Sequence, residues 1–519
     1  MRGTMDGKYF PDAKLFRQKA RKGSLTPICR ELPADLDTPV SVFLKLGQSP
    51  PTFLLESVER GENLGRYSFM GLGHSLMLES KGNRAIIHHG STGGGWVGAN
   101  LFAQEIALES RDPLHLIQEI NRKRAAVRIP GLPPFCGGAV GYLAYDIVNF
   151  FEELPQCSHD ELDLPDCFFL FADTLLAFDH VQHKMKIIAN AYVDDDVDAA
   201  YHQAVSEIEA IIARLTSPLP QEYRVLSMEY REGLSDNRQL ASNFSRDEFA
   251  GMVSTAREYI AAGDAIQIVL SQRLRRKTSA KPFDIYRALR MVNPSPYMFY
   301  LNFGQFQLIG SSPEMLVKLD GERAESRPIA GTCPRGQTEE EDLSLITELL
   351  ADPKERAEHV MLVDLARNDL GRVCQYGTVK VPELMGVERY SHVSHIVSAV
   401  EGRLNPGEDA FSLLRASFPA GTVSGAPKIR AMEIITEMEK TRRGPYAGAV
   451  GYFDFTGNMD TCITIRTIVM KEDTVYLQAG AGIVADSDPL TEHQETLNKL
   501  KALEKAIIVA EGGDKSFEY

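Results

Sequence analysis

Short segments of alternating hydrophobic and polar residues dominate the first 215 positions, and this two-residue period is typical of half-buried strands. The segments are rich in β-branched and aromatic residues and are bounded by Gly or Asn; the predicted strands cover 52–57, 75–79, 167–171 and 185–188. From 199 to 215 the apolar residues change to helical spacing, and this helix is expected to end before Pro218.

The second half mixes the two periods. Ser245 followed by Glu248 has the spacing of a capping box and predicts the start of a helix. Further strands are expected at 267–270, 297–303, 314–319 and 391–400, and further helices at 339–350, 355–365, 409–416 and 424–439. The stretch 446–484 predicts a three-stranded meander with turns at 456–458 and 471–473, and the last helix should begin around Asp488 and Pro489.

A polar stretch with two prolines and neither period, 217–243, marks the expected boundary between two parts. The predicted domains are 1–216, a linker 217–244, a domain 245–511 and a tail 512–519. Strand-rich stretches with grouped helices favour an α+β fold over a regular βαβ array. We therefore expect a large β-rich sandwich with helices outside, in which the N-terminal part packs on the C-terminal part.

Composition narrows the possible functions. The net charge of −15 repels nucleic acid and anionic membrane surfaces. The seven cysteines form no CxxC pair, which argues against a zinc site or a disulfide framework. The chain has no apolar run of about 18 residues, and residues 1–30 lack the apolar core of a secretory signal. A protein of the reducing cytoplasm that binds neither nucleic acid nor membranes is expected.

Two glutamates, Glu358 and Glu495, fall on predicted helices that could face each other across the C-terminal sheet. Hard oxygen ligands suit Mg²⁺, which usually takes only one or two protein carboxylates plus an oxygen-rich substrate. Glu495 shares a helix face with Glu492 and Lys499, a pattern that by itself is more typical of a solvated flank. Neither glutamate is a strong signal alone.

Polar residues also interrupt apolar strands. His395 shares a predicted strand face with Val393 and Val397, as a hydrogen-bonded core residue or a general base, and His392 lies on the opposite face. Arg466 is expected in mid-strand, where either a substrate carboxylate or a structural salt bridge would satisfy its guanidinium.

Two glycine-bearing segments could bind an anion. The turn at 421–428, which contains Thr422, leads into a helix with Ser424 as the expected N-cap, but its glycine and lysine spacing is not that of a Walker A loop. The segment 480–482 could form a nest of backbone N–H groups; a bulge or a close backbone approach is the structural alternative.

Taken together, these segments resemble the chorismate-utilising enzymes, and within them the large aminase subunits of anthranilate synthase. The resemblance covers most of the chain and is strongest from 293 to 501. The motifs that carry it are FLLES at 53–57, NPSPYM at 293–298, GSSPE at 310–314, RPIAGT at 327–332, EHVMLVDLARND at 358–369, PAGTVSGAPK at 419–428 and GAG at 480–482.

The resemblance implies a fold and a set of roles. Glu358 and Glu495 would hold Mg²⁺ against the ring carboxylate of chorismate. Contacts to the rest of the substrate would come from Gly331, Thr332, Tyr446, Arg466, Gly480, Ala481, Gly482 and Lys499. His395 and Thr422 match residues tied to the chemistry, and Glu314 is a candidate acid for the departing C4 hydroxyl. Ser57 with Pro296, Tyr297 and Met298 matches the family's tryptophan pocket, so feedback inhibition is implied.

Two missing lysines separate this chain from close relatives. Aminodeoxychorismate synthases commonly carry a nucleophilic lysine where this chain has Ala330, and water-activating relatives use a lysine in a strand that matches 267–270. With neither lysine, attack by free ammonia on chorismate favours anthranilate as the product, the first committed step of tryptophan biosynthesis. Because the chain lacks a Gly-x-Cys-x-Gly segment, a separate glutamine amidotransferase subunit is expected to supply the ammonia. One departure is Cys333, where the family usually has arginine.

Two alternatives remain at this stage. One is an aminodeoxychorismate synthase that works without the lysine. The other is a catalytically silent tryptophan-binding regulator built on the same scaffold.

Overall fold

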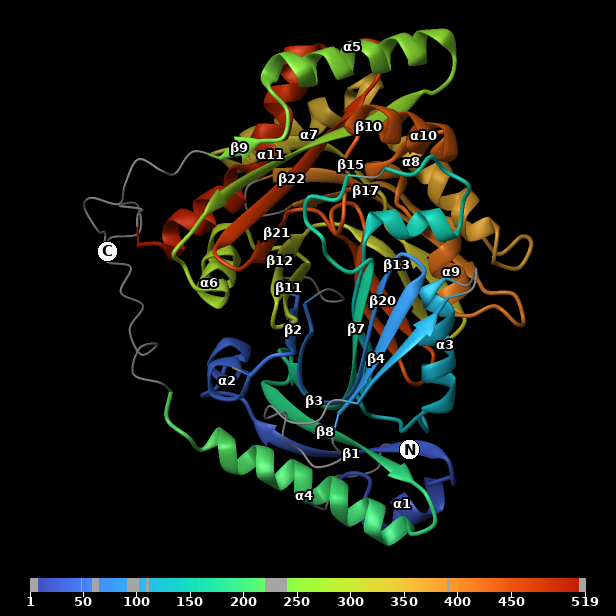
Figure 1. Ribbon diagram of the computed structural model, residues 1–519, viewed down its shortest axis with the longest axis vertical. Helices are drawn as coiled ribbons and strands as arrows, with labels where there is room; N and C mark the ends of the chain where they lie inside the picture. The colour runs from blue at the N-terminus through green and yellow to red at the C-terminus, as the bar shows by residue number, and fades with distance from the viewer. Residues whose placement is uncertain are drawn as a thin grey trace.

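A continuous antiparallel β-sheet folds into two facing layers at the centre of the molecule, and the helices lie on its outside (Figure 1). The computed structural model describes residues 8–47, 49–57, 65–90, 102–108, 112–157, 159–219, 240–389 and 393–512. All the named strands within these ranges pair antiparallel. The α+β sandwich expected from the sequence is confirmed.

The first layer joins strands from both halves of the chain. Its order is β10 (Gln267–Lys277), β22 (Thr474–Ile483), β21 (Thr467–Lys471), β12 (Phe306–Ser312), β11 (Tyr297–Asn302) and β2 (Thr52–Glu56). Two short strands, β9 (Ala241–Ser242) and β18 (Gly425–Ala426), also pair with β10. The N-terminal strand β2 therefore continues the sheet of the C-terminal half.

The second layer also mixes the two halves. Its order is β7 (Cys167–Asp179), β6 (Gly138–Leu143), β19 (Ala449–Asp454), β20 (Met459–Ile463), β13 (Met315–Asp320), β14 (Arg323–Ser326) and β17 (Val393–Arg403). Strand β17 further pairs with β15 (Ile329–Pro334) and with β16 (Lys380–Arg389). These last strands form the part of the layer that carries His395.

One long strand, β3 (Tyr67–Lys81), connects the layers. Its first half pairs with β2, its second half pairs with β4 (Arg84–His89), and β7 accompanies it throughout with register shifts between Gly71 and Leu76. Bulges of this kind let strands turn from one layer to another. Strand β4 continues to β5 (Phe102–Ala107), and β7 continues through β8 (Lys184–Val193) to β1 (Ser24–Pro33).

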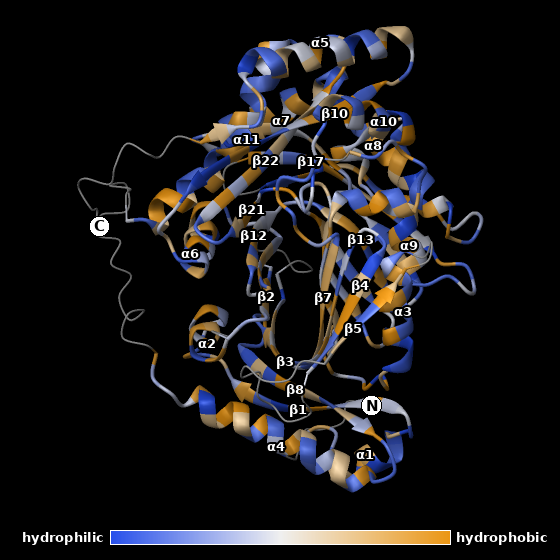
Figure 2. Ribbon diagram, viewed as in Figure 1, coloured by the Kyte–Doolittle hydropathy of each residue, from blue (hydrophilic) through white to orange (hydrophobic). Residues whose placement is uncertain are grey.

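The helices cover the outer faces of the layers. They are α1 (Ala13–Lys19), α2 (Pro39–Leu46), α3 (Pro113–Lys123), α4 (Val197–Leu215), α5 (Arg246–Ala262), α6 (Pro282–Val292), α7 (Glu339–Ala351), α8 (Pro353–Gly371), α9 (Ala410–Ser417), α10 (Lys428–Glu439) and α11 (Pro489–Ala510), with 3₁₀ turns η1 (Tyr145–Phe150) and η3 (Gly421–Val423). Figure 2 shows hydrophilic and hydrophobic residues mixed along α4 and α5, whereas β7 is mostly hydrophobic. This amphipathic pattern is typical of helices that cover a core.

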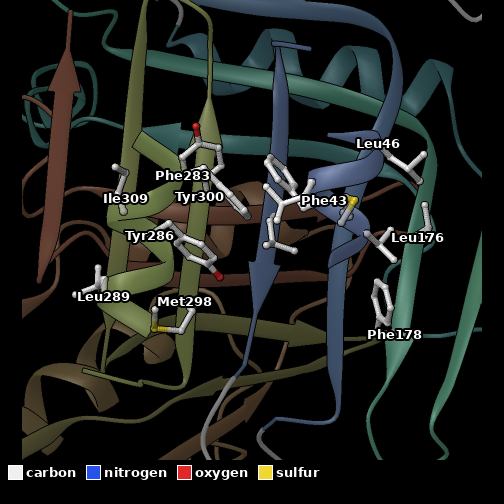
Figure 3. Close-up of a cluster of buried hydrophobic side chains, with 14 of the residues drawn as sticks. Phe43, Leu46, Leu176, Phe178, Phe283, Tyr286, Leu289, Met298, Tyr300 and Ile309 are labelled. Carbon is white, nitrogen blue, oxygen red and sulfur yellow. The ribbon is translucent and has the colours of Figure 1, made fainter. Parts of the chain in front are cut away.

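Aromatic side chains pack helices of both halves onto the first layer. Figure 3 shows Phe43 of α2 and Phe283 of α6 beside Tyr300 of β11. The Phe43 and Phe283 rings stack with centroids 4.3 Å apart, and Phe43 meets the edge of Tyr300 at 5.5 Å. Because strands and core are shared, the two halves pack as expected, and the exact division into domains stays a prediction.

Most predicted elements are present, with three corrections. The predicted meander has four strands, because Arg466 lies between β20 and β21 with a left-handed backbone (φ 51°) and is not in mid-strand. Ser424 does not cap α10, because the N-cap of that helix is Pro427. The Ser424 hydroxyl donates to Ala420 O instead. The 480–482 segment is regular β22 paired to β10 and forms no nest.

His392 lies outside the described residues. No helix in the described ranges is long and apolar enough to cross a membrane.

Gly141 in β6 offers a test of the close packing at the centre of the second layer. A Cβ at this position would lie 1.9 Å from Phe168 O, a backbone atom that cannot move away alone. We expect Gly141→Ala to lower the free energy of unfolding by about 1–3 kcal/mol, measured by urea denaturation. Gly251→Ala in α5 is the control, because a Cβ there meets open space; equal stability of the two variants would contradict the packing argument.

Candidate functional site

Four carboxylates from two helices gather at one end of the first layer. Glu355 and Glu358 lie one turn apart on α8, whose first N–H groups are capped by Asp352, and Glu492 and Glu495 lie one turn apart on α11. Burial, then the negative charges of Glu358, Asp352 and Glu495, raise the pKa of Glu355. Burial and the charge of Glu495 likewise raise the pKa of Glu492. The two predicted metal ligands therefore share one electrostatic environment.

Each predicted ligand already has a polar neighbour. Gln267 of β10 donates from Nε2 to Glu358 Oε1 at 3.0 Å. Lys499, one turn after Glu495, pairs with its carboxylate at 2.6 Å and also donates to Gly480 O at 2.9 Å. Through these contacts β10, β22, α8 and α11 are joined around the acidic group.

The donor set suits a hard divalent cation completed by other ligands. Within the described ranges, no three acidic, histidine or cysteine side chains converge closely enough to hold a metal ion by themselves. Mg²⁺ does not require such a cage, because it keeps several waters and takes one or two carboxylates plus substrate oxygens. Burial is the main cause of the raised pKa values of Glu355 and Glu492, and the repulsion from neighbouring carboxylates that adds to it is what a bound cation would relieve.

Cationic and phenolic groups lie next to the carboxylates. The Arg466 guanidinium donates to Lys499 O, and burial lowers its pKa. The left-handed backbone at Arg466 is strained for a non-glycine residue, a feature that concentrates at functional sites. Tyr446 is buried, which raises its pKa to about 12, so the phenol stays neutral.

The glycines of β22 allow this close packing. A Cβ on Gly480 would come 2.8 Å from Tyr446 Oη, and one on Gly482 would come 2.7 Å from Gln267 Nε2. Gly480 also lies close to backbone, since a Cβ there would come 2.8 Å from Leu270 O, which is the close backbone approach named as the structural alternative, whereas at Gly482 it is a side chain that comes close. Ala481 between them is fully buried and pairs with Leu270.

Glu314 is a carboxyl group held in an apolar environment. It lies between β12 and β13 and is only 7% exposed. Burial raises its pKa to about 8, although the nearby Thr422 hydroxyl and the Lys499 charge lower it in part. Thr422 lies in η3, and its buried hydroxyl lies beside the Glu314 carboxyl. Glu314 is therefore a protonated acid near neutral pH.

His395 and Thr332 face each other across β17 and β15. Thr332 Oγ1 lies 2.9 Å from His395 Nδ1, which is also 3.2 Å from Gly331 O. Gly331 sits at a register shift with φ 72°, where a Cβ would meet Ile396 and Glu355. Burial, with the charge of Arg466, lowers the pKa of His395, so the imidazole is neutral at pH 7.

A separate cavity of about 140 Å³ is lined by all four residues predicted for the regulatory pocket, Ser57, Pro296, Tyr297 and Met298. Ser57 Oγ is buried and has no partner within the described part of the chain. Tyr297 Oη donates to Asp460 Oδ1 at 3.0 Å. The cavity thus has aromatic walls and one hydroxyl, Ser57 Oγ, that is available to a ligand.

Sequence reasoning missed Glu355 and Arg443 and noted Glu492 only as a neighbour of Glu495 on its helix face. Glu355 and Glu492 each lie three positions before a predicted ligand, a spacing that places the two glutamates of each helix on one face. Arg443 could not be recognised from the sequence, because it belongs to no helical or strand period of hydrophobic residues. It is 2% exposed, pairs with Glu439 at 2.6 Å and donates to Val423 O at 2.7 Å and Val269 O at 2.8 Å.

Cys333, the one visible departure from the expected pattern, packs in a small apolar cluster with Ile346, Leu349 and Ile396. The adjacent Arg335 forms an ion pair with Asp342 at 2.8 Å. The thiol therefore fills apolar space.

Comparison with known proteins identifies the family of the chain. The family model for chorismate binding enzymes matches residues 73–505. The chain belongs to this family. It is 46% identical to anthranilate synthase component 1 of Acetivibrio thermocellus over 96% of this chain and 98% of the relative, and 46% identical to that of Aquifex aeolicus over 95% and 97%.

Solved structures show the same relationship. Anthranilate synthase component I from Streptococcus pneumoniae superposes with a TM-score of 0.73 at 36% identity, covering 91% of this chain and 99% of that one. The menaquinone-specific isochorismate synthase MenF from Escherichia coli, at 20% identity and a TM-score of 0.67 over 95% of this chain and 98% of that one, is similar in fold alone. The chorismate-utilising fold expected from the sequence is confirmed.

The raised pKa of Glu314 predicts a pH effect on stability. In the unfolded chain this carboxyl titrates near 4.5, whereas in the fold it keeps its proton up to about pH 8. Unfolding between these values releases a proton, so the contribution of Glu314 is full below about pH 4.5 and is lost as the pH rises to about 8, by up to about 1.4 kcal/mol per pH unit.

Urea denaturation at pH 5.5 and 7.5 measures this loss, and Glu314→Gln, which keeps a neutral side chain, should reduce it. Glu408→Gln at an exposed loop position should leave it unchanged. An equal pH dependence in wild type and Glu314→Gln would show that the buried acid does not carry the proton.

Proposed function

We propose that this enzyme is the aminase component of an anthranilate synthase, which converts chorismate and ammonia to anthranilate and pyruvate. The observation that carries the proposal is the neutral acid Glu314 in the same site as the anion-binding Arg466 and the paired carboxylates Glu358 and Glu495. The full-length likeness to relatives named anthranilate synthase component 1 supports it.

The site residues account for binding of a dianionic substrate. Arg466 offers a guanidinium to one carboxylate, with Tyr446 and the Gly480–Gly482 backbone beside it. Mg²⁺ held by Glu358 and Glu495 would bind the other carboxylate and withdraw charge from the conjugated ring. Lys499 orients Glu495 through their ion pair, and its positive charge offsets part of the negative charge of the carboxylates.

The acid and base assignments follow from burial. Ammonia adds at C2 while the C4 hydroxyl leaves, and hydroxide leaves poorly unless it is protonated. Glu314, with its proton retained near pH 7 and the Thr422 hydroxyl close by, supplies that proton. His395, neutral and held through Nδ1, is the candidate base for the proton removed when pyruvate departs and the ring becomes aromatic.

The nucleophile is ammonia in this proposal. Ala330 stands where aminodeoxychorismate synthases use a lysine, and the strand 267–270, which matches the strand that carries the lysine of the water-activating relatives, contains no lysine. Gln267 of this strand is bound to Glu358. Six of the seven cysteines are buried, and Cys157 is half-buried, so a separate glutaminase component is proposed as the ammonia source. A cytoplasmic location is part of this proposal.

Tryptophan is the proposed inhibitor at the cavity of Ser57, Pro296, Tyr297 and Met298. Ser57 Oγ would bind the polar end of the ligand, and Met298 would contact the indole edge. Asp460 and Lys318, which lie 3.6 Å apart on the same cavity wall, offer charges of both signs to an amino acid.

Product analysis tests the reaction. With chorismate, Mg²⁺ and an ammonium salt, we expect fluorescence and mass spectrometry to identify anthranilate, with pyruvate released in equal amount. Accumulation of 4-amino-4-deoxychorismate would assign the chain to the aminodeoxychorismate synthases instead. Binding of tryptophan without turnover under these conditions would indicate a silent regulator.

Glu358→Gln and Glu495→Gln test the metal role. Loss of either charge should reduce turnover at least about 100-fold and abolish Mg²⁺ binding by calorimetry while the thermal midpoint stays near that of wild type. Glu340→Gln, at an exposed position on α7, is the matched control. Unchanged Mg²⁺ binding in either variant would remove that residue from the metal site.

Ser57→Arg tests the inhibitor pocket. The longer side chain fills the cavity, so the tryptophan concentration for half inhibition should rise at least about tenfold while ammonia-dependent activity is kept. Ser57→Ala, which leaves the space open, should show a smaller change. Normal inhibition of Ser57→Arg would place the regulatory site elsewhere.

A further inference from the structure

A second, smaller cavity of about 40 Å³ lies beside the Glu314 carboxyl and extends to Ser417 and Asp369, to which the proposed function assigns no role. It extends from Glu314 and Thr422 to Ser417 at the end of α9 and Asp369 on α8. Leu316, Leu362, Leu365 and Ala366 supply apolar walls. The cavity therefore joins the proposed acid to a second carboxyl group.

Two buried hydroxyls line this cavity. Thr422 Oγ1 lies beside the Glu314 carboxyl and lowers its pKa in part, whereas Ser417 Oγ has no hydrogen-bond partner in the part of the chain described by the structure. A buried polar atom left unpaired costs about 1–3 kcal/mol. A water molecule, whose share of liquid volume is about 30 Å³, fits the space and finds the two to four polar partners that buried water needs.

The far end of the cavity reaches toward solvent. Asp369 accepts from Lys428 Nζ at 2.8 Å, and their side chains are 11% and 13% exposed. Burial raises the pKa of Asp369, while the charges of Lys428 and Arg372 lower it in part. Glu314 itself is buried, and the charged group that acts on it is Lys499. A proton taken from solvent at Asp369 would have a polar route inward.

We propose that this cavity binds water that returns a proton to Glu314 after each turnover, with Ser417 and Asp369 as the groups that hold and supply it. The inference rests on the proposed function, in which Glu314 gives its proton to the C4 hydroxyl and is left as a carboxylate. Asp369, an ion-paired carboxylate at rest, first takes up one proton from solvent. The cavity water then donates one O–H proton to Glu314 and accepts that proton from Asp369, which leaves Glu314 protonated and Asp369 ionised as they began. The proton that this route delivers for the C4 hydroxyl is balanced by the one that the amine and the ring release, so the whole reaction consumes no net proton.

Valine and threonine at position 417 separate the hydroxyl from its volume, because the two side chains have nearly the same shape. We expect Ser417→Val to lower kcat at least about tenfold with KM for chorismate and ammonia unchanged and a larger solvent deuterium isotope effect. Ser417→Thr should recover most of that loss, and both variants should melt within about 2 °C of each other. Equal kcat in the two variants would overturn the proposal. A raised KM for ammonia at normal kcat would also overturn it and would identify an ammonia passage.

Asp369→Asn tests the outer end. It should lower kcat to a similar degree, and the double variant with Ser417→Val should be no slower than the slower single variant, because residues that act in one route are not additive. Additive losses would contradict a shared route.

An infrared measurement separates failure of this inference from failure of the proposed function, because it needs no turnover. The carboxylic-acid band that disappears in Glu314→Gln reports the proton on Glu314. After transfer to heavy water, its exchange should be slower in Ser417→Val than in Ser417→Thr. Equal exchange rates would overturn the water route even if the enzyme makes anthranilate, and slower exchange would support it even if the product differs.

Discussion

The buried ion pair between Glu439 and Arg443 is the interaction on which the arrangement of the site depends. The guanidinium bonds both oxygens of Glu439 at 2.6 and 2.8 Å, and its other donors reach Val423 O and Val269 O. Its face lies 4.7 Å from the Tyr145 ring centre and 5.6 Å from that of Tyr446. The Arg443 side chain thus holds Val423, which follows Thr422, and β10, which carries Gln267. It also packs against Tyr446, a proposed substrate contact. A buried pair of this kind is stable only because its donors and acceptors are satisfied; removing one partner typically costs about 3–5 kcal/mol.

Solvent access divides the carboxylates of the site into two kinds. Glu314 is surrounded by apolar groups, and burial outweighs the help of Thr422 and Lys499, so it keeps a proton. Glu495 is 46% exposed and paired with Lys499, which suits a charged group. The same residue type can therefore serve as proton donor in one place and as cation ligand in another, with no difference that a sequence motif displays.

The elements that could be predicted from sequence are those fixed by local chemistry. The α5 capping box at Ser245 and Glu248 and the start of α11 at Asp488 were predicted and are present. The mid-strand position of Arg466 was wrong because apolar alternation continues through a residue whose backbone turns left-handed, which no period reveals. Ser424 was wrong as a helix cap because β18 intervenes and Pro427 takes that place. The raised pKa of Glu314 required tertiary packing and could not be read from its neighbours in sequence.

The proposed inhibitor pocket and the proposed active site are connected through one strand. Tyr297 of the pocket pairs in register with Ser312 of β12, whose hydroxyl donates to Ile463 O at 2.6 Å, and Ile463 N donates to Glu314 O at 3.0 Å. The preceding residue, Ser311, donates from N to Arg466 O at 3.1 Å. Coupling between two sites needs a shared element with alternative positions, and the paired strands β11 and β12, which lead from Tyr297 to Ser311 and its bond to the left-handed residue Arg466, are the element that these two sites share.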